Sequence, residues 1–65
     1  MTTFSAHTFE VGHAYTFMYD GKERLVHVEC KGKDWIRGYD SIIGDYRTYS
    51  LELCDSIPEE VEVAH

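Results

Sequence analysis

Residues 35–53, WIRGYDSIIGDYRTYSLEL, decide the fold that we expect of this chain. The stretch holds the only tryptophan and two runs in which the side chains alternate in character. A period of two among residues that favour extended backbone is typical of β-strands. We therefore expect strands over 35–39 and 46–53, and between them a loop over 40–45 whose Ile42 and Ile43 fold back over the core.

Two further strands are predicted upstream of this stretch. Aromatic residues alternate with other residues over 14–19, and residues 23–30 form the returning strand. Asp20-Gly21 lies between the two runs and favours a type I′ hairpin turn, which needs positive φ at both central residues. Gly38, in the middle of the third strand, predicts a bulge or a tight bend.

The rest of the chain predicts a single turn of the 3-10 type over 54–58 and a short last strand over 60–63. No apolar residues recur at helical spacing over three turns. We therefore expect an all-β fold: a small SH3-like or Sm-like barrel of four or five antiparallel strands, with a short 3-10 turn before the last strand, closed around the Trp35 indole. A barrel of the OB type is the nearest alternative.

The length of 65 residues allows one domain, residues 1–65. So short a chain buries only about 60% of the surface that its unfolded form exposes. The apolar fraction of 43% and the aromatic fraction of 14% indicate a compact globular domain. We expect 1–9 to be a loose N-terminal lead-in that Phe4 and Phe9 pin to the barrel, and 58–65 to be an acidic C-terminal strand or tail.

The two cysteines, Cys30 and Cys54, bear on the compartment. The N-terminal MTTFSAHTFE has neither the basic region nor the apolar run of a secretory signal. We therefore expect a cytoplasmic protein whose two thiols are reduced and packed in the core. No stretch approaches the roughly 20 apolar residues that cross a bilayer, so no membrane association is expected.

The net charge of −6 is unevenly distributed. All six Lys and Arg residues lie between positions 22 and 47, and the six carboxylates between positions 20 and 47 balance their charge. The stretch 52–62 carries five carboxylates and no base. This distribution opposes nonspecific binding to phosphate backbones, which requires a basic stripe. It favours solubility, a basic partner or no particular partner.

Four segments of the chain carry a resemblance to a known family. They are Tyr19, Arg24-Leu25-Val26, Trp35-Ile36-Arg37-Gly38-Tyr39-Asp40 and Tyr46-Arg47-Thr48-Tyr49-Ser50-Leu51. Over residues 15–54 the chain resembles a stand-alone, divergent WYL domain. The resemblance implies an SH3-like/Sm-like sheet and the role attributed to that family, which is the sensing of nucleotides or single-stranded nucleic acid.

The motif that names the family is altered in this chain. Ile36 and Arg37 stand in place of its Tyr and Leu. Residues 52–54, Glu-Leu-Cys, stand in place of the family's closing Asp-Arg-Ile, so the second ligand-contacting Arg is missing. With Arg47 as the single basic pocket residue, the resemblance implies weak binding of an anionic ligand.

The candidate binding residues are aromatic and basic side chains of the predicted strands. They are Tyr19, His27, Trp35, Arg37, Tyr39, Arg47 and Tyr49. In one interpretation Arg47 clamps a phosphate or carboxylate while Tyr19 and Tyr39 stack on a ring. In the other interpretation Arg47 pairs with Asp40 or Asp45 across its own loop. Aromatics that exceed the capacity of the core, with an arginine nearby, are also typical of protein-binding hot spots.

Catalysis, a cofactor and a bound metal are not expected. The two cysteines do not have the Cys-x2-Cys spacing of a zinc site, and no two histidines have the His-x3-His spacing. His27 and Cys30 fall on opposite faces of the predicted strand, which opposes a Cys–His nucleophile. The chain also has no Gly-rich phosphate loop.

The first functional hypothesis is a non-catalytic acidic module that docks on a protein partner and modulates or inhibits it. By analogy with small acidic products of phages and mobile elements, that partner belongs to host nucleic-acid or defence machinery in the host cytoplasm. The alternative is a WYL-type sensor that binds a nucleotide or a short single-stranded oligonucleotide near Arg47. A third hypothesis is a homo-oligomer formed through an exposed strand edge.

Overall fold

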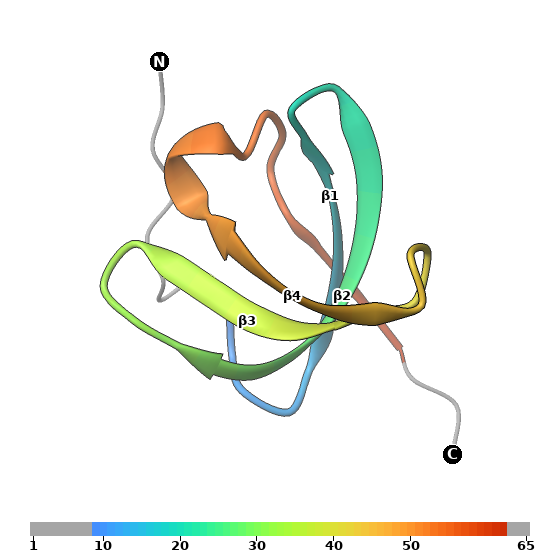
Figure 1. Ribbon diagram of the computed structural model, residues 1–65, viewed down its shortest axis with the longest axis vertical. Coiled ribbons are helices and arrows are strands. Elements are labelled where there is room, and N and C mark those ends of the chain that lie inside the picture. The colour runs from blue at the N-terminus through green and yellow to red at the C-terminus, as the bar shows by residue number, and fades with distance from the viewer. Residues whose placement is uncertain (1–8, 63–65) are drawn as a thin grey trace.

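The computed structural model describes residues 9–62. They form one antiparallel sheet of five strands: β1 (Ala14–Tyr19), β2 (Lys22–Lys31), β3 (Trp35–Asp40), β4 (Asp45–Ser50) and β5 (Glu59–Val61). A 3-10 turn, η2 (Leu51–Leu53), follows β4 (Figure 1). The all-β prediction with a 3-10 turn before the last strand is confirmed, although the turn begins earlier than predicted and shortens the fourth strand. Within the described residues, no helix is long and apolar enough to span a membrane.

The sheet does not close into the predicted barrel. Its strands lie in the order β4-β3-β2-β1-β5, and β4 and β5 do not pair with each other within residues 9–62. The sheet is strongly bent (Figure 1). The chain leaves the sheet after Ser50 and contacts β1 through an isolated bridge between Tyr19 and Cys54 and through hydrogen bonds of Met18 with Asp55 and Ser56. It then returns as a strand of only three residues. So short a strand lacks the paired backbone groups that closure requires.

The hairpin between β1 and β2 forms as the sequence predicts. Asp20 and Gly21 have φ values of 50° and 76°, and the register pairs Tyr19 with Lys22 on either side of them. Positive φ at both central residues gives the turn the twist of the flanking strands. This turn sets the register that places every side chain of β1 and β2 on its face.

The core lies on one face of the sheet, which we call the inner face. It consists of Phe9, Tyr15, Phe17, Val26, Val28, Ile36, Tyr49, Leu51 and Cys54. Phe9 is fully buried, and its ring meets those of Tyr15 and Phe17 edge-on at centroid distances of 5.1 and 5.6 Å. Phe9 therefore packs in the core of the sheet. Phe4 and the rest of the predicted lead-in lie outside the described residues.

Trp35 is not part of this core, and the prediction that the sheet closes around its indole is wrong. Side chains alternate along β3, so Ile36 is fully buried while Trp35 is 37% exposed on the opposite, outer face. The indole lies over Gly32, where an added Cβ would overlap its ring. The sequence predicted that Trp35 points into the core, but along β3 it is Ile36 that points inward and fills it.

A bulge in β2 between Val28 and Cys30 changes the face that Cys30 occupies. Cys30 is exposed, so the prediction of two core thiols holds for Cys54 alone. The irregularity predicted at Gly38 lies on β2 instead. Gly38 pairs with Val28, and an added Cβ there would overlap the carbonyl of His27. Glycine is therefore required where the bulged strand comes close to β3.

The loop between β3 and β4 does not fold over the core, contrary to the prediction for Ile42 and Ile43. Their side chains are 53% and 39% exposed. The Asp40 carboxylate accepts hydrogen bonds from the backbone N–H groups of both residues, at 2.9 and 3.2 Å. These bonds hold the loop as a tight turn, which directs both isoleucines outward.

The two borders of the sheet differ in chemistry. On β4, the N–H of Tyr46 donates to Asp45 Oδ1 at 2.8 Å and the N–H of Ser50 donates to Tyr19 Oη at 3.3 Å. Side chains therefore satisfy two backbone donors of this border. The other border, β5, is short and carries exposed carboxylates at 59 and 60. Both features disfavour the addition of a further strand.

Candidate functional site

The seven predicted binding residues do not form one site. His27, Trp35, Arg37 and Tyr39 share the outer face of β2 and β3, whereas the other three line a hollow on the other side of the sheet; these are Tyr19, Arg47 and Tyr49. Successive side chains of a strand point to opposite faces of the sheet, so the register of the strands places the two sets on different faces. Each set is therefore a separate candidate site.

An aromatic row crosses the outer face. The register aligns Tyr46 of β4 with Tyr39 of β3, and Tyr39 with His27 of β2. The two tyrosine rings meet edge-on at 5.3 Å between centroids, and the His27 ring is 6.4 Å from Tyr39. Tyr46 is 53% exposed. With Trp35 and Arg37, which continue along β3, these side chains form what we call the aromatic face.

Beside β1 lies a hollow of about 320 Å³ that apolar and acidic side chains line together. Met18 and Ile57 line it and are both exposed, Ile57 at 76%. Glu23 and Glu59 stand at its sides, because β2 and β5 flank β1 at these positions. The arrangement is suited to an alkyl chain that ends in a cation, as in lysine or arginine.

A second hollow, of about 260 Å³, is cationic. Its lining consists of Tyr19, Asp20, Lys22, Arg24, Ile43, Arg47, Thr48 and Tyr49. The sequence interpretation singled out Arg47 but missed Lys22 and Arg24. The hairpin turn between β1 and β2 brings these two across from β4, and no motif in the sequence marked that approach. Three cations around two tyrosine rings can bind an anionic ring compound.

The alternative interpretation of Arg47, an ion pair with Asp40 or Asp45, is not what the structure shows. Among residues 9–62 no ion pair involves Arg47, and Arg24 Nε lies 4.0 Å from Asp40 Oδ2 instead. Asp40 is fully buried and also accepts the hydroxyl hydrogen bond of Tyr49. Burial, followed by this contact with Asp40, raises the pKa of Tyr49. Tyr49 is therefore a structural hydrogen-bond donor, and within residues 9–62 no carboxylate pairs with Arg47.

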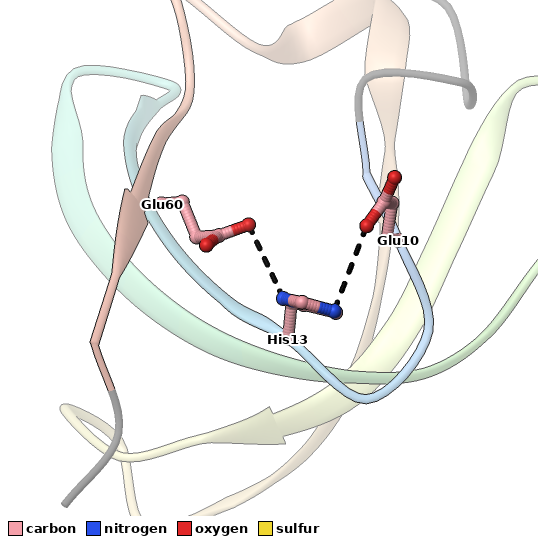
Figure 2. Close-up of side chains that lie close together, drawn as sticks. All are labelled: Glu10, His13 and Glu60. Atoms are coloured by element: carbon pink, nitrogen blue, oxygen red, sulfur yellow. Dashed lines mark ion pairs between the residues drawn. The ribbon is translucent and has the colours of Figure 1, made fainter.

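A cluster of two carboxylates and one imidazole lies beside the start of β1. Figure 2 shows the His13 imidazole between the carboxylates of Glu10 and Glu60. His13 Nε2 is 3.5 Å from Glu10 Oε2, and Nδ1 is 3.2 Å from Glu60 Oε1. All three side chains are about half exposed or more. The sequence interpretation missed this cluster because Glu60 is far from His13 along the chain and no short motif links them.

Comparisons of the chain with models of known families, with curated proteins and with solved structures gave no match. The functional proposals therefore rest on the geometry and chemistry of the aromatic face, the two hollows and the cluster around His13.

Proposed function

We propose that this chain is a non-catalytic binding module that docks on a basic surface of a protein partner through its outer face. The observation that carries the proposal is the aromatic face, where Trp35, Tyr39 and Tyr46 are exposed while the core is filled without them. Large rings that remain in solvent on a rigid sheet lose little conformational entropy on binding. Arg37, between Trp35 and Tyr39 on the same face of β3, adds a residue type that is enriched in hot spots.

The charge of the chain supports a basic partner. The net charge is −6, and Glu23 and Glu59 border the apolar hollow on the β1 side. A lysine or arginine of the partner would place its alkyl stem against Met18 and Ile57 and its charge between the two carboxylates. A basic surface of this kind commonly binds nucleic-acid phosphates, so docking would displace them and inhibit the partner.

The face is a better docking surface than either border of the sheet. Side chains already satisfy two backbone donors of β4, and carboxylates occupy β5. A partner strand added at β4 would displace the side chains that bind these donors. A partner strand added at β5 would bring its backbone against the carboxylates. The homo-oligomer predicted through a strand edge has less support than docking on the face for the same reason.

The test is affinity capture from a bacterial lysate with the wild type and two variants. The double variant Tyr39→Ala/Tyr46→Ala removes the exposed tyrosine pair, and Val11→Ser removes an exposed apolar side chain outside the face. We expect one stoichiometric partner with a basic surface to be retained by the wild type and by Val11→Ser, to be lost from the double variant, and to be released by added salt. The proposal fails when no partner is retained by the wild type, or when the double variant retains it equally.

A second candidate function rests on the cationic hollow. Lys22, Arg24 and Arg47 surround Tyr19 and Tyr49 there, which supports a WYL-type sensor that binds a nucleotide or a short single-stranded oligonucleotide. Arg24 is partly engaged by Asp40. Most of the attraction to phosphate is therefore left to the other two cations.

Calorimetry with nucleotides, cyclic ones included, tests this second function. We expect Arg47→Ala to weaken binding at least tenfold, and the matched variant Arg37→Ala, on the opposite face, to leave it unchanged. The sensor function is contradicted if the wild type gives no heat of binding at millimolar nucleotide. It is also contradicted if both variants lose the same amount of affinity.

A further inference from the structure

The cluster of Glu10, His13 and Glu60 is built from two segments that hydrogen bonds hold together. Glu10 and His13 belong to the turn before β1, where the His13 N–H donates to the Glu10 carbonyl at 3.2 Å. Glu60 is in β5 and pairs with Tyr15 of β1. The backbone therefore fixes the positions from which the three side chains approach one another (Figure 2).

The spacing of the side-chain donor atoms suits a small divalent cation. One nitrogen or oxygen atom of each residue lies within 4.8 Å of the others. The ligands of a tetrahedral zinc ion lie roughly 3.3 Å apart, because Zn–N and Zn–O bonds are about 2.0–2.2 Å long. His13 Nδ1 and Glu60 Oε1, at 3.2 Å, already have this separation. The Glu10 side chain is 67% exposed and can rotate toward the same ion.

We propose that Glu10, His13 and Glu60 bind a divalent transition-metal ion, with zinc as the best fit. One neutral imidazole and two carboxylates balance a charge of +2. A nitrogen ligand favours zinc over magnesium and calcium, which prefer oxygen ligands alone. Water completes the coordination, since the cluster is open to solvent.

The surroundings of the cluster provide a second imidazole and room for water. A hollow of about 290 Å³ adjoins it, and His13, His27, Glu60 and Glu62 are among its lining residues. His27 of β2 therefore lies near the cluster but is not among its three closely spaced side chains. The His13 imidazole, which lies between the two carboxylates, distinguishes the cluster from a group of acidic side chains alone.

Metal binding would connect the turn before β1 to β5, which is the shortest strand of the sheet. An ion that binds only the folded chain stabilises it in proportion to the logarithm of its concentration. We therefore expect zinc to raise the thermal midpoint in a concentration-dependent manner. The proposal is independent of the docking face and of the cationic hollow.

The experiment is a calorimetric and thermal titration of the full chain with zinc chloride, with magnesium chloride as the comparison. His13→Gln is expected to weaken zinc binding at least tenfold. The matched variant His27→Gln removes one imidazole from the adjoining hollow and should change affinity less than threefold. Glu60→Gln and Glu62→Gln form a second matched pair, in which the first substitution alone should weaken binding strongly.

The outcomes separate this site from adventitious binding. Equal affinity in the wild type and His13→Gln, equal loss in the two histidine variants, or no response to millimolar zinc would each overturn the proposal. Cobalt(II) in place of zinc gives an independent readout, because its visible absorption reports the ligand geometry. Loss of that spectrum in His13→Gln, with folding confirmed by circular dichroism, is the result that we expect.

Discussion

The hydroxyl group of Tyr49 donates a hydrogen bond to Oδ2 of Asp40, and this bond connects β4 to the end of β3 beneath the loop that joins them. Asp40 is fully buried. Its other oxygen accepts the N–H groups of Ile42 and Ile43, and Arg24 of β2 lies 4.0 Å from the carboxylate. One side chain therefore fixes the loop and its two flanking strands, and the cationic hollow depends on it.

Substitution of Tyr49 by phenylalanine tests the importance of this hydrogen bond. The change leaves a buried carboxylate oxygen without its hydroxyl donor, so we expect a loss of about 1–3 kcal/mol in the free energy of unfolding. Urea denaturation measures it. Tyr46→Phe removes an exposed hydroxyl and is the matched control, expected to fall within about 0.5 kcal/mol of the wild type. Similar values for the two variants would contradict the role given to Asp40.

The raised pKa of Tyr49 predicts a specific dependence of stability on alkaline pH. The neutral hydroxyl is favoured in the folded chain relative to an unfolded tyrosine, whose pKa is about 10. Its contribution is therefore complete below pH of about 10 and is lost as the pH rises toward the higher folded value. The difference in unfolding free energy between the wild type and Tyr49→Phe should shrink above pH of about 10. A difference that stays constant to pH of about 11.5 would contradict this assignment.

The two thiols should differ in reactivity. Cys30 is exposed, whereas Cys54 is buried, and burial is the main cause that raises the pKa of its thiol. Because the thiolate is the reactive species, we expect iodoacetamide to modify Cys30 in the native chain and both residues in denaturant. Mass spectrometry of the peptides measures the two rates. Equal rates of modification of the two cysteines in the native chain would contradict the burial of Cys54.

Gly38→Ala should destabilise the fold although it adds one methyl group. The new Cβ would overlap the backbone carbonyl of His27 on the neighbouring strand β2. We expect a loss of about 1–3 kcal/mol. Thr48→Ala, at an exposed position of the neighbouring strand, serves as the control for a harmless change. A neutral Gly38→Ala would mean that the two strands separate easily at this point.

The sequence predicted the strands well because each of them is marked locally. Alternation marks β1, β2 and β3, and Asp20-Gly21 fixes the hairpin turn between the first two. The predicted strand over 46–53 was too long, since Leu51 continues the apolar alternation although the backbone turns there. Alternation identifies the residues that face the core, but it does not show where the backbone stops being extended.

Long-range features were less accessible to sequence reasoning. The outward position of Trp35 depends on the parity of β3 relative to Ile36, and both residues are apolar enough for either face. The approach of Lys22 and Arg24 to Arg47, and of Glu60 to His13, depends on how strands distant in sequence are placed. Neither approach leaves a local pattern.

The treatment of the sheet borders also determines how copies of this chain behave when they are concentrated. On β4, backbone N–H groups that would otherwise pair with a strand of another molecule donate hydrogen bonds to the side chains of Tyr19 and Asp45. On β5, Glu59 and Glu60 repel the same residues of a second copy. Growth of a continuous ribbon from molecule to molecule is thereby hindered in both directions. We therefore expect the chain to resist fibril formation when it is concentrated, as the stoichiometric inhibitor proposed above would need to do.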